Sequence, residues 1–206
     1  MKLDNLRKYP NKEQFLSEVR AKTFETEIKC HGCAQVIVHT FLDILEADNR
    51  QASMAASPFA AGLALTGNNC GAAIGALMVL GLVYGRRDVN EGMEGNLKGI
   101  RPMRKFVKYF EEKHGHINCR DLTGTDLANP QKATAYFEAG GLEKCATMMA
   151  DAAGFVAGMG DDDAGQAGVE ERGALGAAAA FVDFDLFADP VEGRGDVLGH
   201  GCASFL

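Results

Sequence analysis

The feature that most constrains the fold is an apolar stretch from Cys70 to Tyr84, which contains no charged side chain. A helix that is apolar on every side is buried in the middle of a protein or crosses a membrane. This stretch is shorter than the roughly 20 residues that a membrane span needs. Asn68 and Asn69 come directly before it. The sequence therefore predicts a central helix surrounded by the other elements of a globular domain.

Apolar residues recur at helical spacing in several other segments of the chain. Asn129-Pro130 adds a start signal, because Asn caps helices and Pro is tolerated in the first turn. No segment alternates with a period of two, so a sheet is not expected. We expect an all-α fold, a compact helical bundle. The expected helices cover 12–28, 36–45, 70–84, 101–114, 129–140 and 142–155, with a further helix opening at Ser57-Pro58.

Charge is distributed unevenly along the chain, which has 206 residues and a net charge of −7. Residues 153–206 hold 10 acidic residues and two arginines, a net charge of −8, which leaves +1 for residues 1–152. The same segment is rich in Gly and Ala and has little large apolar surface to offset the entropy of ordering it. We expect a folded domain at 1–152 and a disordered acidic tail at 153–206.

Composition excludes several classes of function. A pI near 5.2 argues against a nucleic-acid partner held through its phosphates. Residues 1–12 are charged and lack the apolar region of a secretory signal. No P-loop, dinucleotide fingerprint or Ser-His-Asp arrangement is present. We therefore expect a cytoplasmic protein without a membrane span, in which cysteines are metal ligands or redox thiols rather than structural disulfides.

The cysteines carry whatever chemistry the chain has. We expect Cys33, Cys70 and Cys145 near helix starts, and Cys119 in a loop, so that these thiols meet where element ends converge. Cys70 should favour the thiolate, because the dipole and free N–H groups of a helix N-terminus stabilise negative charge. The alternative is that these cysteines are inert thiols of the core, since free Cys is often buried. The six positions are Cys30, Cys33, Cys70, Cys119, Cys145 and Cys202.

Glycines recur within the apolar stretch, and each weakens a helix by about 1 kcal/mol relative to Ala. Gly71 and Gly75 are four residues apart and share one face. Stacked glycines let a second backbone, or a bound group, approach closely. We expect leucine at Gly75 to be more damaging than leucine at Gly99. His31 and His116 lie near cysteines, and we interpret both as solvated rather than as ligands.

Four segments of the chain together resemble the C_GCAxxG_C_C family of redox-active proteins. They are Cys33-Ala34-Gln35, the stretch Asn69 to Arg86, Cys119 to Gly124 and Lys144-Cys145. The likeness runs from about Cys30 to Ala152, and Cys70 to Gly75 has the form C-G-A-x-x-G. Residues 60–64, Ala-Ala-Gly-Leu-Ala, stand where the family usually carries more glycine. The same unit resembles the N-terminal part of split-Soret cytochromes c.

The resemblance implies a metal site formed by Cys33, Cys70, Cys119 and Cys145, with Gly71 and Gly75 beside the cofactor. An iron–sulfur cluster is implied, because four thiolates suit such clusters and other soft metals. No haem is expected, because Ala34 follows Cys33 where haem attachment needs His. The expected role is electron transfer to or from a redox partner protein, or cluster carrying.

Two other classes of function stay open. A thiol/disulfide sensor or oxidoreductase without metal would use Cys30 and Cys33 as its natural pair. A small helical interaction module would merely bury its cysteines. The sequence leaves open whether the protein is an enzyme and whether it forms a homodimer.

Overall fold

The computed structural model describes residues 9–159, and the expected acidic tail from residue 160 onward lies outside the described residues. Within residues 9–159 all regular elements are helices and no strand is present. The β-type pairing in this range is an isolated bridge between Asn69 and Asn118. The all-α expectation is confirmed. No helix within these bounds combines the length and apolarity needed to cross a membrane.

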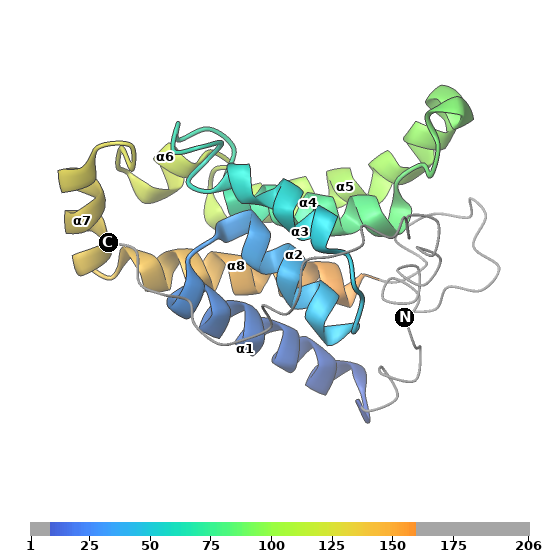
Figure 1. Ribbon diagram of the computed structural model, residues 1–206, viewed down its shortest axis with the longest axis horizontal. Helices are drawn as coiled ribbons and strands as arrows, with labels where there is room; N and C mark the ends of the chain where they lie inside the picture. The colour runs from blue at the N-terminus through green and yellow to red at the C-terminus, as the bar shows by residue number, and fades with distance from the viewer. Residues whose placement is uncertain (1–8, 160–206) are drawn as a thin grey trace, which may run out of the picture.

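Four helices form the centre of the bundle (Figure 1). The long pair α1 (Lys12–Cys30) and α8 (Gly141–Gly158) pack along one another, and α2 (Cys33–Ile44) packs against α4 (Gly71–Tyr84). Helix α4 also contacts α8, which places it between two layers. The expected central helix is therefore confirmed.

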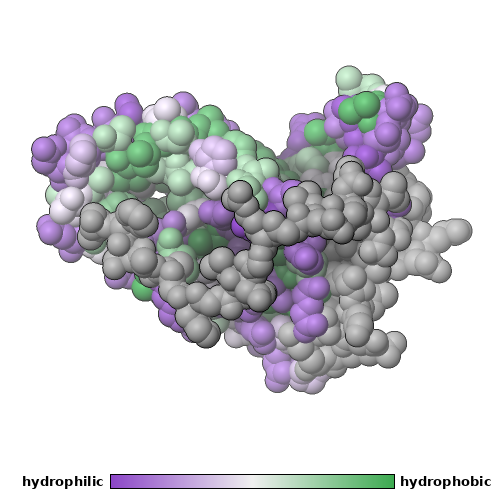
Figure 2. Space-filling view, viewed as in Figure 1, coloured by the Kyte–Doolittle hydropathy of each residue, from purple (hydrophilic) through white to green (hydrophobic). Residues whose placement is uncertain are grey.

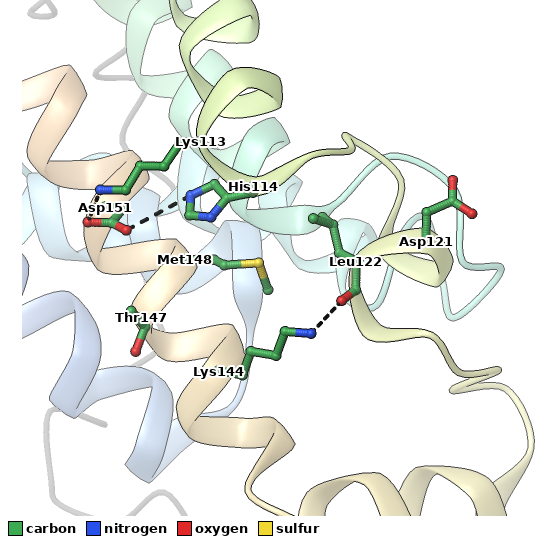
Figure 3. Close-up of a pocket in the computed structure, with 8 residues that line it drawn as sticks. All are labelled: Lys113, His114, Asp121, Leu122, Lys144, Thr147, Met148 and Asp151. Carbon is green, nitrogen blue, oxygen red and sulfur yellow. Dashed lines mark hydrogen bonds and ion pairs between the residues drawn. The ribbon is translucent and has the colours of Figure 1, made fainter.

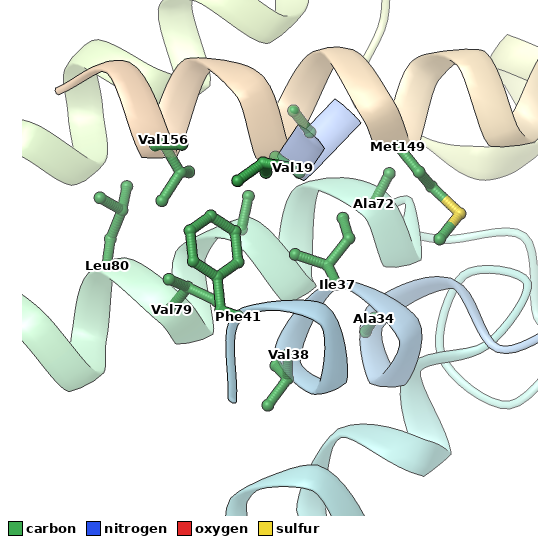
Figure 4. Packing of buried hydrophobic residues seen from close by; sticks show 14 of the residues in the cluster. Val19, Ala34, Ile37, Val38, Phe41, Ala72, Val79, Leu80, Met149 and Val156 are labelled. Carbon is green, nitrogen blue, oxygen red and sulfur yellow. The ribbon is translucent and has the colours of Figure 1, made fainter. Parts of the chain in front are cut away.

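Side chains from all four helices meet in one apolar cluster (Figure 4). Val19 of α1, Ile37 of α2, Leu80 of α4 and Met149 of α8 are each at most 1% exposed. Helix α5 (Gly92–His114) covers α4 and adds Phe106 and other aromatic rings. Burial of one such side chain stabilises a fold by about 1.5–3 kcal/mol, so this cluster holds the helices together.

The first half of α5 departs from the expectation. The helix begins at Gly92, well before residue 101, and continues across Pro102. Its early turns project from the body (Figure 1), and hydrophilic and hydrophobic residues mix on the projecting end (Figure 2). Met93 is 68% exposed there. Its glycines and asparagine are poor helix formers, which hides the first half of the helix from sequence reasoning.

Short elements complete the chain. Ser57-Pro58 opens a short 3-10 helix, η2 (Ser57–Phe59), in place of the expected α-helix, and η2 follows the unexpected helix α3 (Arg50–Ala56). Cys119 does not lie in a loop, because it begins α6 (Cys119–Thr123). A 3-10 turn, η3 (Val89–Glu91), precedes α5, and α7 (Pro130–Glu138) begins at the expected Asn129 cap. Helices of five or seven residues are too short to show a clear period.

The C-terminal end of α8 changes the expected domain boundary. The helix runs through Gly158, and Val156 and Met159 are each 2% exposed within the core. The Lys12 ammonium donates to the Gly158 carbonyl at 2.6 Å. The folded unit therefore extends beyond residue 152.

Candidate four-cysteine site

Within residues 9–159, four cysteines carry free thiols: Cys33, Cys70, Cys119 and Cys145. Each lies at or near the N-terminal end of a helix. Cys33 and Cys119 are the first residues of α2 and α6, Cys70 caps α4, and Cys145 lies one turn into α8. Negative charge on a sulfur is stabilised at such helix ends. The structure thus gives all four thiols the same kind of backbone setting.

Cys70 and Cys119 are tied together through the backbone. The Cys70 N–H donates to the Ile117 carbonyl at 2.8 Å, and the Cys119 N–H donates to the Asn68 carbonyl at 2.7 Å. These two bonds flank the bridge between Asn69 and Asn118. Two segments far apart in sequence therefore hold two thiols beside each other.

Cys33 approaches the same place from α2. A Cβ atom at Gly71 would collide with the Cys33 Cβ and would lie 2.7 Å from the Phe59 carbonyl. A Cβ at Gly75 would lie 2.8 Å from the Ala34 Cα. The backbone that approaches these two glycines is that of α2 and the η2 turn. Their assignment to a cofactor stays a prediction.

Glu27 fixes the turn that presents Cys33. Its carboxylate accepts hydrogen bonds from the Gly32 N–H at 2.9 Å and from the Cys33 N–H at 3.1 Å. The residue is only 3% exposed. Cys33 has a φ of 33° and His31 a φ of 49°, both in the region that favours glycine. A buried carboxylate therefore holds a strained turn in place.

A second strained segment borders the site between η2 and α4. Five successive residues have positive φ: Ala61, Gly62, Leu63, Ala64 and Leu65. Left-handed backbone costs a residue with a side chain roughly 1–2 kcal/mol, so glycine would suit these positions better. The segment overlaps residues 60–64, where the resemblance implies more glycine. The Ala61 N–H nevertheless donates to the Cys33 thiol from within it.

Burial dominates the electrostatics of the thiols. It raises the pKa of Cys70 to about 11 and that of Cys119 to about 12. It also raises the pKa of Cys33 and of Cys145. The N–H groups of Ala72 and Ala73 lower the pKa of Cys70, as the helix N-terminus predicts. The expected preference of Cys70 for the thiolate is nevertheless wrong, because desolvation outweighs these donors.

The thiols are close enough to influence one another. Negative charge on Cys70 and on Cys145 raises the pKa of Cys33 and of Cys119. The Glu27 carboxylate raises the pKa of Cys33, Cys70 and Cys145 in the same way. The structure therefore brings the four cysteines that the sequence indicated into one electrostatic cluster.

Tyr136 of α7 covers this cluster. Its hydroxyl lies 3.6 Å from the Cys145 sulfur, and a side chain at Gly141 would collide with its ring. The hydrogen bond lowers the pKa of Cys145, while burial and the thiols raise the pKa of Tyr136. Helix α7 has no buried residue of its own. Tyr136 is therefore the contact through which α7 reaches the cluster.

Sequence reasoning missed both Glu27 and Tyr136. Glu27 had a signal, because it continues the spacing of four set by the buried residues Phe15, Val19 and Thr23 of α1. An acidic residue on the inward face of a helix needs a partner. No comparable signal marked Tyr136. Cys30, His31 and His116 are exposed, and Cys202 lies outside the described residues.

The donor set suits a soft metal in its chemistry. Four thiols are present, and backbone N–H groups already reach two of the sulfurs. Such donors stabilise charge on sulfur ligands. Within residues 9–159, however, no group of three or more His, Cys, Asp or Glu side chains is placed to hold a metal ion. The residue types fit a metal–thiolate centre, whereas the side-chain positions would have to adjust to form one.

Comparison with known proteins gives one match. The family model described as "Putative redox-active protein (C_GCAxxG_C_C)" matches residues 31–159. No curated protein matches the chain, and no solved structure does. The matched segment covers more than half of the chain and contains all four free thiols, whereas Cys30 and Cys202 lie outside it. The chain therefore belongs to the C_GCAxxG_C_C family of redox-active proteins.

Proposed function

We propose that Cys33, Cys70, Cys119 and Cys145 bind an iron–sulfur cluster or another soft metal, and that the protein transfers electrons or carries the cluster. The observation that carries this proposal is the set of four free thiols, each at or near a helix N-terminus and each within electrostatic reach of another. A bound cluster would supply one-electron exchange. The relation to split-Soret cytochromes c, an electron partner protein, a homodimer and a cytoplasmic location stay predictions.

The surrounding residues would support such a centre. Ala61, Ala72 and Ala73 donate N–H groups to sulfur, which offsets negative charge on the thiolates. Glu27 holds the turn before α2, and the Tyr136 hydroxyl lies 3.6 Å from the Cys145 sulfur, where it would donate to a thiolate. Because burial raises the thiol pKa values, metal must displace protons, so affinity should increase with pH.

A second candidate is a reversible dithiol, favoured by the absence of a ready metal-ligand arrangement among the described side chains. Two thiols would give two electrons and two protons to an oxidant and form one disulfide. The sequence indicated Cys30 and Cys33 as the pair. The structure does not form this pair, because Cys30 is disulfide-bonded whereas Cys33 carries a free thiol. The expectation that the cysteines form no disulfide is therefore wrong for Cys30.

Metal and sulfide analysis of protein purified without oxygen distinguishes the two candidates. Brown protein that contains iron and acid-labile sulfide supports the cluster. Colourless protein in which a two-electron oxidant consumes two thiols supports the dithiol.

Serine variants then test the ligand set. Serine at Cys33, Cys70, Cys119 or Cys145 should remove most of the metal, whereas Cys202→Ser should retain it. Unchanged metal in Cys70→Ser would refute the site. Loss of two-electron oxidation in Cys30→Ser would instead favour the dithiol.

A further inference from the structure

A cavity of about 520 Å³ lies beside the four-cysteine site, between the C-terminal end of α5, α6 and α8 (Figure 3). Its lining includes Lys113 and His114 from α5, Leu122 from α6, and Lys144, Met148 and Asp151 from α8. A volume of this size accommodates a small metabolite. The lining combines the apolar side chains of Leu122 and Met148 with a few charged and polar groups, as ligand pockets generally do.

His114 has an unsatisfied nitrogen in this cavity. Its Nε2 atom is buried and makes no hydrogen bond within the described part of the chain. Oδ2 of Asp151 lies 4.0 Å away, which makes an ion pair when the ring is protonated but is beyond hydrogen-bond distance. The ring packs on Phe110 with a centroid separation of 4.7 Å, which fixes its position. Buried polar atoms are rarely left without a partner, so a bound molecule would satisfy this one.

The charges of the cavity favour an anion. Asp151 is already neutralised, because Lys113 and Arg20 both reach its Oδ1 atom, at 2.8 and 2.7 Å. The Lys144 ammonium donates at 2.8 Å to the Leu122 carbonyl, which carries no charge. Asp121 is the other acid of the lining, and its carboxylate accepts from the Asn118 amide at 3.1 Å. Two lysines and two aspartates line the cavity, and Arg20, from outside the lining, gives Asp151 a second cation, so Lys144 is the lysine of the lining that pairs with no carboxylate of the described residues.

We propose that this cavity binds a small molecule that carries an oxyanion, a carboxylate or a phosphate. Lys144 supplies the cation, because its ammonium group keeps two N–H donors after the bond to the Leu122 carbonyl. His114 supplies a ring nitrogen whose position is fixed. Lys144 adjoins Cys145, and Leu122 lies one turn after Cys119. The bound molecule would therefore contact the two helices that carry these thiols. The proposal does not depend on the proposed redox function.

Calorimetric titration of the full-length protein tests the proposal with two probes, inorganic phosphate and malate. We expect saturable binding of at least one of them. Lys144→Gln should weaken that binding about tenfold, the effect of losing one charge-assisted contact. Lys108→Gln is the matched control, because Lys108 lies on α5 and pairs with Glu112 at the surface, and its variant should bind as the parent does.

His114→Phe provides an independent variant that keeps the ring packing on Phe110 and removes both nitrogens. It should also weaken binding, and the His114 imidazole signals should shift when the probe binds to the parent protein. Binding of phosphate alone identifies a phosphate site, and binding of malate identifies a carboxylate site. The proposal is overturned if neither probe binds, or if the Lys144→Gln and His114→Phe variants bind the probe as tightly as the parent protein does.

Discussion

The apolar centre of the bundle and the four-cysteine end are built in different ways. In the centre, regular helices bury side chains such as Ile37 and Leu80, and close packing specifies their arrangement. At the cysteine end, positive-φ turns, a two-residue bridge and one buried carboxylate hold the thiols. The comparison teaches that apolar burial in the centre stabilises the protein. At the cysteine end, strained backbone that positions reactive groups lowers this stability.

Truncation should have the largest effect, because the end of α8 belongs to the centre. A chain that ends after Ala152 loses Val156 and Met159, which are each 2% exposed. Burial of two such side chains is worth about 3–6 kcal/mol, so this chain should unfold or aggregate. A chain that ends after Met159 should melt cooperatively. Equal thermal melts of the two chains would show that the end of α8 contributes little.

A methyl group at Gly75 should be the next most damaging change. The added Cβ would lie 2.8 Å from the Ala34 Cα and carbonyl, which are backbone atoms and cannot rotate away. Overpacking of this kind costs about 1–3 kcal/mol. Gly81→Ala is the matched control on the same helix, because a Cβ there meets nothing within 4 Å. It should stabilise by about 0.5–1 kcal/mol. Urea unfolding of both variants measures the difference.

Glu27→Ala should disturb the cysteine end more than the centre. The change leaves the N–H groups of Gly32 and Cys33 without their carboxylate, at a cost of about 1–3 kcal/mol. In metal-free protein, Cys33 should then react faster with iodoacetamide. Glu27→Gln keeps one acceptor oxygen and should restore much of the protection. If Ala and Gln variants react alike, the carboxylate does not position Cys33.

The smallest effect has opposite signs in the left-handed segment beside the cysteines and in the regular helix α3. Ala64 has a φ of 51°, so Ala64→Gly should relieve strain and stabilise the protein by about 0.5–1 kcal/mol. Ala55 is exposed within α3, and Ala55→Gly should destabilise it by a similar amount. Chemical denaturation of the two variants provides the check. Destabilisation by both substitutions would mean that the left-handed segment is not strained.

Much of the fold could be predicted from local pattern. Helix α4 could be predicted from the apolar stretch Cys70 to Tyr84, and the start of α7 from Asn129-Pro130. Neither prediction needs information about neighbouring elements. Tertiary contacts determine which glycines can accept a side chain, and these contacts could not be read from the sequence. Leucine at Gly99 was expected to be less damaging than leucine at Gly75, yet a Cβ at either position would collide with backbone, that of Tyr84 at Gly99 and that of Ala34 at Gly75.

The candidate site was predictable in its residues and less so in its chemistry. Cysteine order indicated Cys33, Cys70, Cys119 and Cys145, and the structure brings them together. Desolvation, which raises their pKa values, depends on what covers them and leaves no trace in the sequence. The partner of Cys145, Tyr136, comes from a separate helix and has no spacing rule.

The pairing of α1 with α8 has a consequence for the order of folding. Arg20 and Asp151, which join these helices, are separated by 131 residues. Closing so long a segment of chain is slow compared with forming a helix. During synthesis, Cys33 leaves the ribosome long before Cys145. The four thiols can therefore meet only after nearly the whole domain is available, and any cofactor they bind would enter as a late event of biogenesis.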